Sequence, residues 1–106
     1  MRKITQEATE AFLNGLNYKK TNTEVKVLAL EKGVPCCIAL FLHGHKIAEL
    51  HKNKRVTRLK ITNCNYFTDT TKERLNGLPN VQINQKQGVW YLNGKAWNGE
   101  LITIKQ

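Results

Sequence analysis

The residues best suited to chemistry form a basic segment between positions 46 and 60. Its cations are Lys46, Lys52, Lys54, Arg55, Arg58 and Lys60, and its only carboxylate is that of Glu49. Lysine and arginine side chains neutralise phosphates and release counterions, which gives salt-dependent affinity for nucleic acid without sequence reading. We therefore expect a nucleic-acid-binding surface here. The alternative is a solvated sheet edge, where lysines prevent edge-to-edge aggregation.

The excess of positive charge extends over the whole chain. Its 106 residues hold 17 Lys and Arg against 8 Asp and Glu, a formal net charge of +9. Such a potential favours nucleic acid, an anionic membrane or an acidic protein face, although it can also serve solubility alone. The longest apolar run, residues 34–42, has about half the length of a spanning helix. No signal peptide is recognisable at the N-terminus, so we expect an intracellular protein without a membrane partner.

Aromatic side chains could add base stacking to this basic surface. Tyr66 precedes an expected helix, and Trp97 follows an Asn-Gly hairpin turn. Exposed rings stack on bases of any sequence, so Tyr66 and Trp97 are candidate stacking residues. Packing is the alternative for both, and a tryptophan just past a hairpin turn more often clasps the hairpin.

Metal binding and catalysis find little support in the sequence. Cys36, Cys37 and Cys64 occur with three histidines, but no Cys-x-x-Cys or His-x-x-x-His pair is present. In a strand, Cys36 and Cys37 would point to opposite faces. The carboxylates are spread singly, no Gly-rich phosphate loop occurs, and the chain has no serine. We expect a non-catalytic protein with no metal, no cofactor and free thiols.

Periodicity and turn residues predict the elements that carry these side chains. A helix is expected over residues 5–14, ended by Asn14-Gly15. A second begins within residues 68–73, where Glu73 has the capping-box spacing from Thr70, and ends at Asn76-Gly77. Strands are expected over residues 25–29, 36–42, 46–50, 56–63, 81–83, 89–92 and 101–104. Hairpin turns are expected at His43-Gly44 and Asn93-Gly94.

The order of these elements suggests an internal duplication within one α+β domain of residues 1–106. Leu-Asn-Gly-Leu occurs at residues 13–16 and again at 75–78, and Phe-Leu-His-Gly at 41–44 resembles Tyr-Leu-Asn-Gly at 91–94. We expect two helix–strand–strand–strand units, about residues 1–60 and 61–106, which form an antiparallel sheet with two helices packed on it. Chance is the alternative, because helix ends and hairpins both favour Asn-Gly.

The second half carries a distinctive pattern. It consists of Thr-Thr-Lys-Glu-Arg-Leu-Asn at 70–76, Leu-Pro at 78–79, Gly-Val-Trp-Tyr-Leu-Asn-Gly at 88–94, Trp97 and Gly99-Glu100. With Arg2-Lys3-Ile4-Thr5 and Leu42-His43-Gly44 it resembles short proteins of unassigned function encoded by tailed bacteriophages, gut viral genomes in particular. Residues 24–37 look longer than in similar sequences. The resemblance implies a viral protein in the host cytoplasm, and it brings no activity or site residues with it.

Three classes of function are therefore open. The favoured one is a non-catalytic phage accessory protein that binds nucleic acid through residues 46–60. The alternative is a protein–protein inhibitor of a host defence enzyme, anti-CRISPR-like or acting on another nuclease, which small size and the lack of catalytic groups favour. A virion component is a third possibility. The expected partner is nucleic acid or a host nucleoprotein or defence complex, and the oligomeric state is left open.

Overall fold

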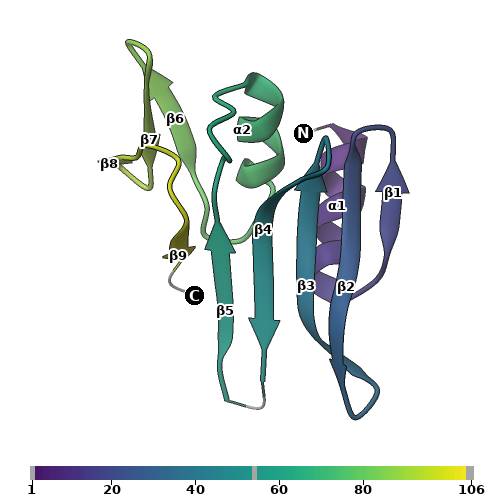
Figure 1. The fold of residues 1–106 in the computed structure, drawn as a ribbon. Coiled ribbons are helices and arrows are strands. Elements are labelled where there is room, and N and C mark those ends of the chain that lie inside the picture. Colours follow the sequence, from purple (N-terminus) through teal and green to yellow (C-terminus); the bar gives the residue numbers. More distant parts are fainter. Residues whose placement is uncertain (1, 54, 105–106) are drawn as a thin grey trace.

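Two antiparallel sheets and two helices make up the fold. The computed structural model describes residues 2–53 and 55–104 (Figure 1). In chain order the elements are α1 (Lys3–Asn14), β1 (Tyr18–Lys20), β2 (Thr23–Glu31), β3 (Val34–Leu42), β4 (His45–Lys52), β5 (Thr57–Ile61), α2 (Asp69–Asn76), β6 (Ile83–Lys86), β7 (Val89–Leu92), β8 (Lys95–Ala96) and β9 (Ile102–Ile104).

The larger sheet has the strand order β1-β2-β3-β4-β5-β9, and the smaller one has the order β6-β7-β8. From β1 to β5 and from β6 to β8, each strand pairs with the next one along the chain, and β9 returns to the larger sheet to pair with β5. At the expected turns, His43-Gly44 and Asn93-Gly94, both residues have positive φ. Turns of that kind match the right-handed twist of the strands that they join.

A single hydrophobic core joins the helices to one face of the larger sheet. Phe12 of α1 and Leu75 of α2 belong to the same buried cluster as Ile38 of β3, Ile61 of β5 and Trp90 of β7. In Figure 1, α1 lies behind β2 and β3. The helix α2 contacts β4, β6 and α1, so it lies between the larger and the smaller sheet.

The predicted class, α+β with antiparallel sheets and two helices, is confirmed. The strand Tyr18–Lys20 was not expected, and the strand expected over residues 81–83 instead begins at Ile83. Two helices layered on a single sheet are not confirmed, because α2 also contacts the smaller sheet.

The expected duplication is not confirmed either. In the described residues, α1 is followed by five strands of the larger sheet, whereas α2 is followed by the three-stranded sheet and β9. The repeated Asn-Gly ends the two helices differently. Gly15 is left-handed (φ 68°), whereas Gly77 is right-handed (φ −73°). A Cβ at Gly77 would lie 2.7 Å from side-chain atoms of Thr5 and Thr9, so close contact with α1 favours glycine there.

The buried guanidinium of Arg74 links both helices to the sheet. Its side chain is 1% exposed. Nε donates to Thr23 Oγ1 at 3.0 Å, and Nη1 donates to Thr5 Oγ1 at 2.8 Å and to Glu73 Oε1 at 2.6 Å. The Thr5 hydroxyl in turn donates to Glu73 Oε1 at 2.8 Å. Nη2 has no hydrogen-bond partner among the described residues, so the bonds that are present must offset the cost of burying the charge.

Replacing Thr5 by valine, which has nearly the same shape, tests this network. Thr5→Val removes an acceptor from Arg74 and a donor from Glu73, so the free energy of unfolding should fall by about 1–3 kcal/mol. Urea denaturation measures the change. The control is Thr57→Val, at an exposed strand position, which should leave stability nearly unchanged. Equal stability of the two variants would contradict the importance of the network.

Candidate nucleic-acid interface

One face of the larger sheet is left without a helix. Strand register places Val25, Ile38, Leu40, Leu50 and Leu59 on the face that packs against the helices. The residues that alternate with these along each strand point the other way, and no described helix lies over them. We call this second surface the open face.

The open face gathers cations from four strands. Register pairs Lys26 with Ala39, Ala39 with Glu49, and Glu49 with Lys60 in one row across the sheet. The row on one side of it holds Lys19, Glu24, Phe41 and Lys46, and the row on the other side holds Cys37, His51 and Arg58. The cations of the open face are therefore Lys19, Lys26, Lys46, Arg58 and Lys60. Its carboxylates are Glu24 and Glu49.

Three of the six predicted cations, Lys46, Arg58 and Lys60, lie together on this face. Arg55 is exposed in the β4–β5 connection, and Lys54 lies outside the described residues. Lys52 points to the helix side, where Nζ donates to the carbonyl oxygen of Leu13 at 2.7 Å. A cation at the C-terminal end of a helix stabilises the helix dipole, so Lys52 has a structural partner away from the open face.

Three members of the open face were not predicted from the sequence, namely Lys19, Lys26 and Phe41. They lie outside residues 46–60, and only the pairing of β1, β2 and β3 brings them beside that segment. The ammonium of Lys26 lies 5.1 Å from the centre of the Phe41 ring, which is within cation–π distance. The alternation of residues 23–31 was the available signal that Lys26 lies on one face of a strand. Only the strand register shows which residues of the neighbouring strands lie beside it.

The two carboxylates neutralise only part of the positive charge. Glu49 Oε2 lies 3.1 Å from Lys46 Nζ, and Glu49 Oε1 lies 2.7 Å from His51 Nε2. Burial alone would raise the pKa of Glu49, but Lys46 and His51 outweigh it and hold this pKa below its usual value. Among the described residues, neither Arg58 nor Lys60 forms an ion pair. These two cations are therefore available to an incoming anion.

The two candidate stacking residues differ in exposure. Tyr66 is 46% exposed, and its ring centre lies 4.6 Å from that of His45, near the β3–β4 turn. Trp97 is only 7% exposed, packs against Trp90 and donates from Nε1 to the carbonyl oxygen of Glu100 at 3.0 Å. A ring with so little exposed surface offers a base almost nothing to stack on, so the burial of Trp97 contradicts the stacking hypothesis for this residue. Tyr66 keeps an accessible ring.

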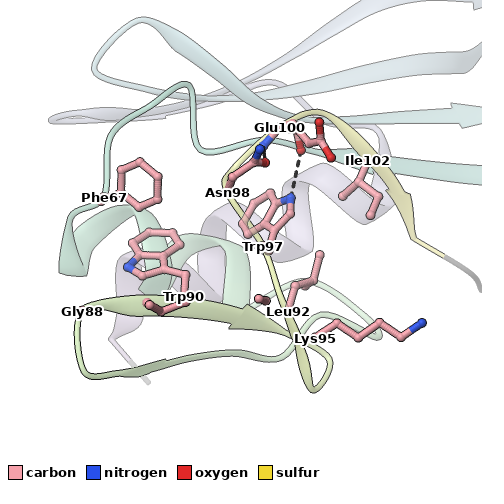
Figure 2. Close-up of a pocket in the computed structure, with 11 residues that line it drawn as sticks. Phe67, Gly88, Trp90, Leu92, Lys95, Trp97, Asn98, Glu100 and Ile102 are labelled. Atoms are coloured by element: carbon pink, nitrogen blue, oxygen red, sulfur yellow. Dashed lines mark hydrogen bonds between the residues drawn. The ribbon is translucent and has the colours of Figure 1, made fainter.

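Trp97 and Trp90 form part of a groove of about 570 Å³ beside the smaller sheet (Figure 2). Phe67 meets the Trp90 ring edge-to-face at 5.2 Å. Phe67, Val89 and Ile102 leave much of their apolar surface exposed. Lys95 and Glu100 are the charged residues of the lining. The lining offers apolar contact and no pairing of a nucleophile with a base.

The cysteines are free thiols of intermediate burial. Burial raises the pKa of Cys37, and Glu49 raises it further; burial also raises the pKa of Cys64. Both side chains are therefore thiols rather than nucleophilic thiolates at neutral pH. Cys37 lies beside Glu49 and His51 on the open face, in the one described grouping of three side chains that could hold a metal ion.

None of the described helices has the length and apolarity to cross a membrane.

Comparison with known proteins identifies the family. No curated protein matches the chain, and no solved structure matches it. The viral origin that the sequence resemblance implies does have support. The family model described as Kyanoviridae Gp96 protein matches residues 1–103, and the chain belongs to this bacteriophage protein family.

Proposed function

We propose that this phage protein is a non-catalytic accessory protein that binds single-stranded nucleic acid through the open face, in the host cytoplasm. The observation that carries the proposal is the convergence of five cations from four strands on the sheet face opposite the helices. Arg58 and Lys60 form no ion pair among the described residues, so they can bind phosphates without first losing a protein partner.

The dimensions of the sheet suit a flexible single strand of nucleic acid. Lys26 on β2 and Lys60 on β5 are separated by three strand spacings, about 14 Å. A backbone laid across the strands would meet Lys26, Lys60 and Arg58 in turn. Open sheets that bind single strands also use aromatic side chains as stacking surfaces. Phe41 on the face and Tyr66 at its end are available for that role, which favours single strands over duplexes.

Binding should weaken steeply with salt. For a single strand the logarithm of affinity falls by about 0.7 per phosphate contact for each tenfold rise in salt. Four contacts would make affinity drop by about 50-fold when salt rises fourfold. Fluorescence anisotropy with labelled single-stranded DNA and RNA measures this slope. A salt-independent affinity would contradict an electrostatic open-face site.

Neutralising Arg58 and Lys60 should reduce that slope. The double variant Arg58→Gln/Lys60→Gln should lower affinity by about tenfold and reduce the slope by about 1.4. The matched control is Lys86→Gln/Lys95→Gln, which removes the same charge from exposed positions of the smaller sheet. Anisotropy titration at several salt concentrations compares the two.

Lys52→Gln provides a second control within the predicted basic segment. Because Lys52 caps α1 from the helix side, this variant should lower stability and leave the salt slope nearly unchanged. A larger loss of binding in Lys52→Gln than in Arg58→Gln/Lys60→Gln would locate the site off the open face.

A protein inhibitor of a host defence enzyme is the second candidate, and the exposed apolar groove favours it. Phe67 and Val89 would contribute contact area typical of a protein interface. Capture experiments from nuclease-treated host lysate separate the two functions. A partner lost in Phe67→Asp and kept in Arg58→Gln/Lys60→Gln supports inhibition. The reverse pattern supports the open face.

A further inference from the structure

Three potential metal ligands converge near the middle of the open face. Cys37 on β3 lies directly opposite His51 on β4. Glu49 precedes His51 by two residues, so both side chains point to the same face of β4. The three side chains therefore meet because of register, with neither a Cys-x-x-Cys nor a His-x-x-x-His motif in the sequence.

The donor atoms of His51 and Cys37 both approach the same carboxylate oxygen of Glu49. Glu49 Oε1 lies 2.7 Å from His51 Nε2 and 3.6 Å from Cys37 Sγ, and all three donor atoms lie within 4.8 Å of one another. Ligands of a tetrahedral zinc ion lie about 3.3–3.7 Å apart, as follows from metal–ligand distances of about 2.0–2.3 Å. The thiol–carboxylate distance already fits. Side-chain rotation of His51 would bring the remaining distances into this range.

The second carboxylate oxygen of Glu49 has a different partner. Lys46 Nζ lies 3.1 Å from Oε2, whereas His51 and Cys37 approach Oε1. The ammonium thus holds the carboxylate in place from the far side and leaves Oε1 directed at the other two donors. Outer partners of this kind orient the ligands of metal sites.

We propose that Cys37, Glu49 and His51 bind a divalent transition-metal ion, with Zn²⁺ as the best match. Thiolate, imidazole and carboxylate are its usual protein ligands, and a three-residue site leaves the fourth position to water. The Cys37 thiol releases its proton to solvent as the sulfur–metal bond forms. Thiolate and carboxylate then balance the two charges of the ion, which is necessary because Lys46, Arg58 and Lys60 are near.

Cobalt titration provides a direct readout of this site. Co²⁺ replaces Zn²⁺ in tetrahedral sites, and a cysteine ligand gives a thiolate-to-cobalt charge-transfer absorption. The full-length protein under reducing conditions should bind one equivalent, show this absorption and lose it when Zn²⁺ is added. Cys37→Ser should abolish the absorption, and His51→Gln should weaken binding by at least about tenfold.

Cys36→Ser is the matched control. It removes the neighbouring thiol, whose strand position points to the opposite face, and it should retain the cobalt absorption at full intensity. Circular dichroism confirms that each variant is folded. Zn²⁺ should also raise the melting temperature of the wild type and of Cys36→Ser, and it should leave the melting temperature of Cys37→Ser unchanged.

Two results would overturn the proposal. One is the absence of thiolate-to-cobalt absorption in the folded, reduced wild type. The other is an absorption that survives in Cys37→Ser and disappears in Cys36→Ser or Cys64→Ser. The test needs no nucleic acid, so its outcome is separate from that of the proposed function.

Discussion

The buried charge of Arg74 is the constraint on which the arrangement of the fold depends. A guanidinium stays protonated, so burying it without hydrogen-bond partners costs a large desolvation free energy. Burial lowers the pKa of Arg74, and the neighbouring Glu73 opposes this shift. Its partners, Thr5 on α1 and Thr23 on β2, bind it from separate elements. The two helices and the sheet must therefore come together on one side.

The open face is the consequence of that one-sided packing. Because side chains alternate along a strand, most of the large apolar residues of β2–β5 turn toward the helices and most of the charged residues turn away. The charged set includes Lys26, Arg58 and Lys60 from three different strands. Concentrated positive charge thus arises on the open face from residues that are far apart in the sequence. The same register brings Cys37 beside His51.

Local signals in the sequence were sufficient for much of the architecture. The helix ends at Asn14 and Asn76 and the hairpin turns after β3 and β7 lie where Asn-Gly and His-Gly predicted them. The strand Tyr18–Lys20 escaped prediction because its three residues are too few to show alternation. Its pairing with β2 and the hydrogen bond from the Tyr18 hydroxyl to Glu7 on α1 hold it in place.

The composition of the surface was harder to predict, because it depends on register. A bulge between Leu40 and Phe41 shifts the β3–β4 pairing, and Lys46 then lies on the same face as Glu49. Residues 46–60 were correctly recognised as rich in cations. The same bulge separates Lys46 from Lys52, which strict alternation would place on one face, and strand pairing adds Lys26 to the open face. The burial of Trp97 likewise depends on the tertiary fold, because Trp97 belongs to the buried cluster that also contains Ile61 of β5 and Leu75 of α2.

Mapping the nucleic-acid contact by NMR tests binding through the open face. ¹⁵N-labelled protein is titrated with a short single-stranded oligonucleotide at low salt, and amide shift changes are followed residue by residue. The largest shift changes should cluster on β2–β5, at Lys26, Phe41, Arg58 and Lys60, and the amides of the smaller sheet should change little. Changes confined to the groove around Phe67 and Trp90, or no changes at all, would contradict binding through the open face.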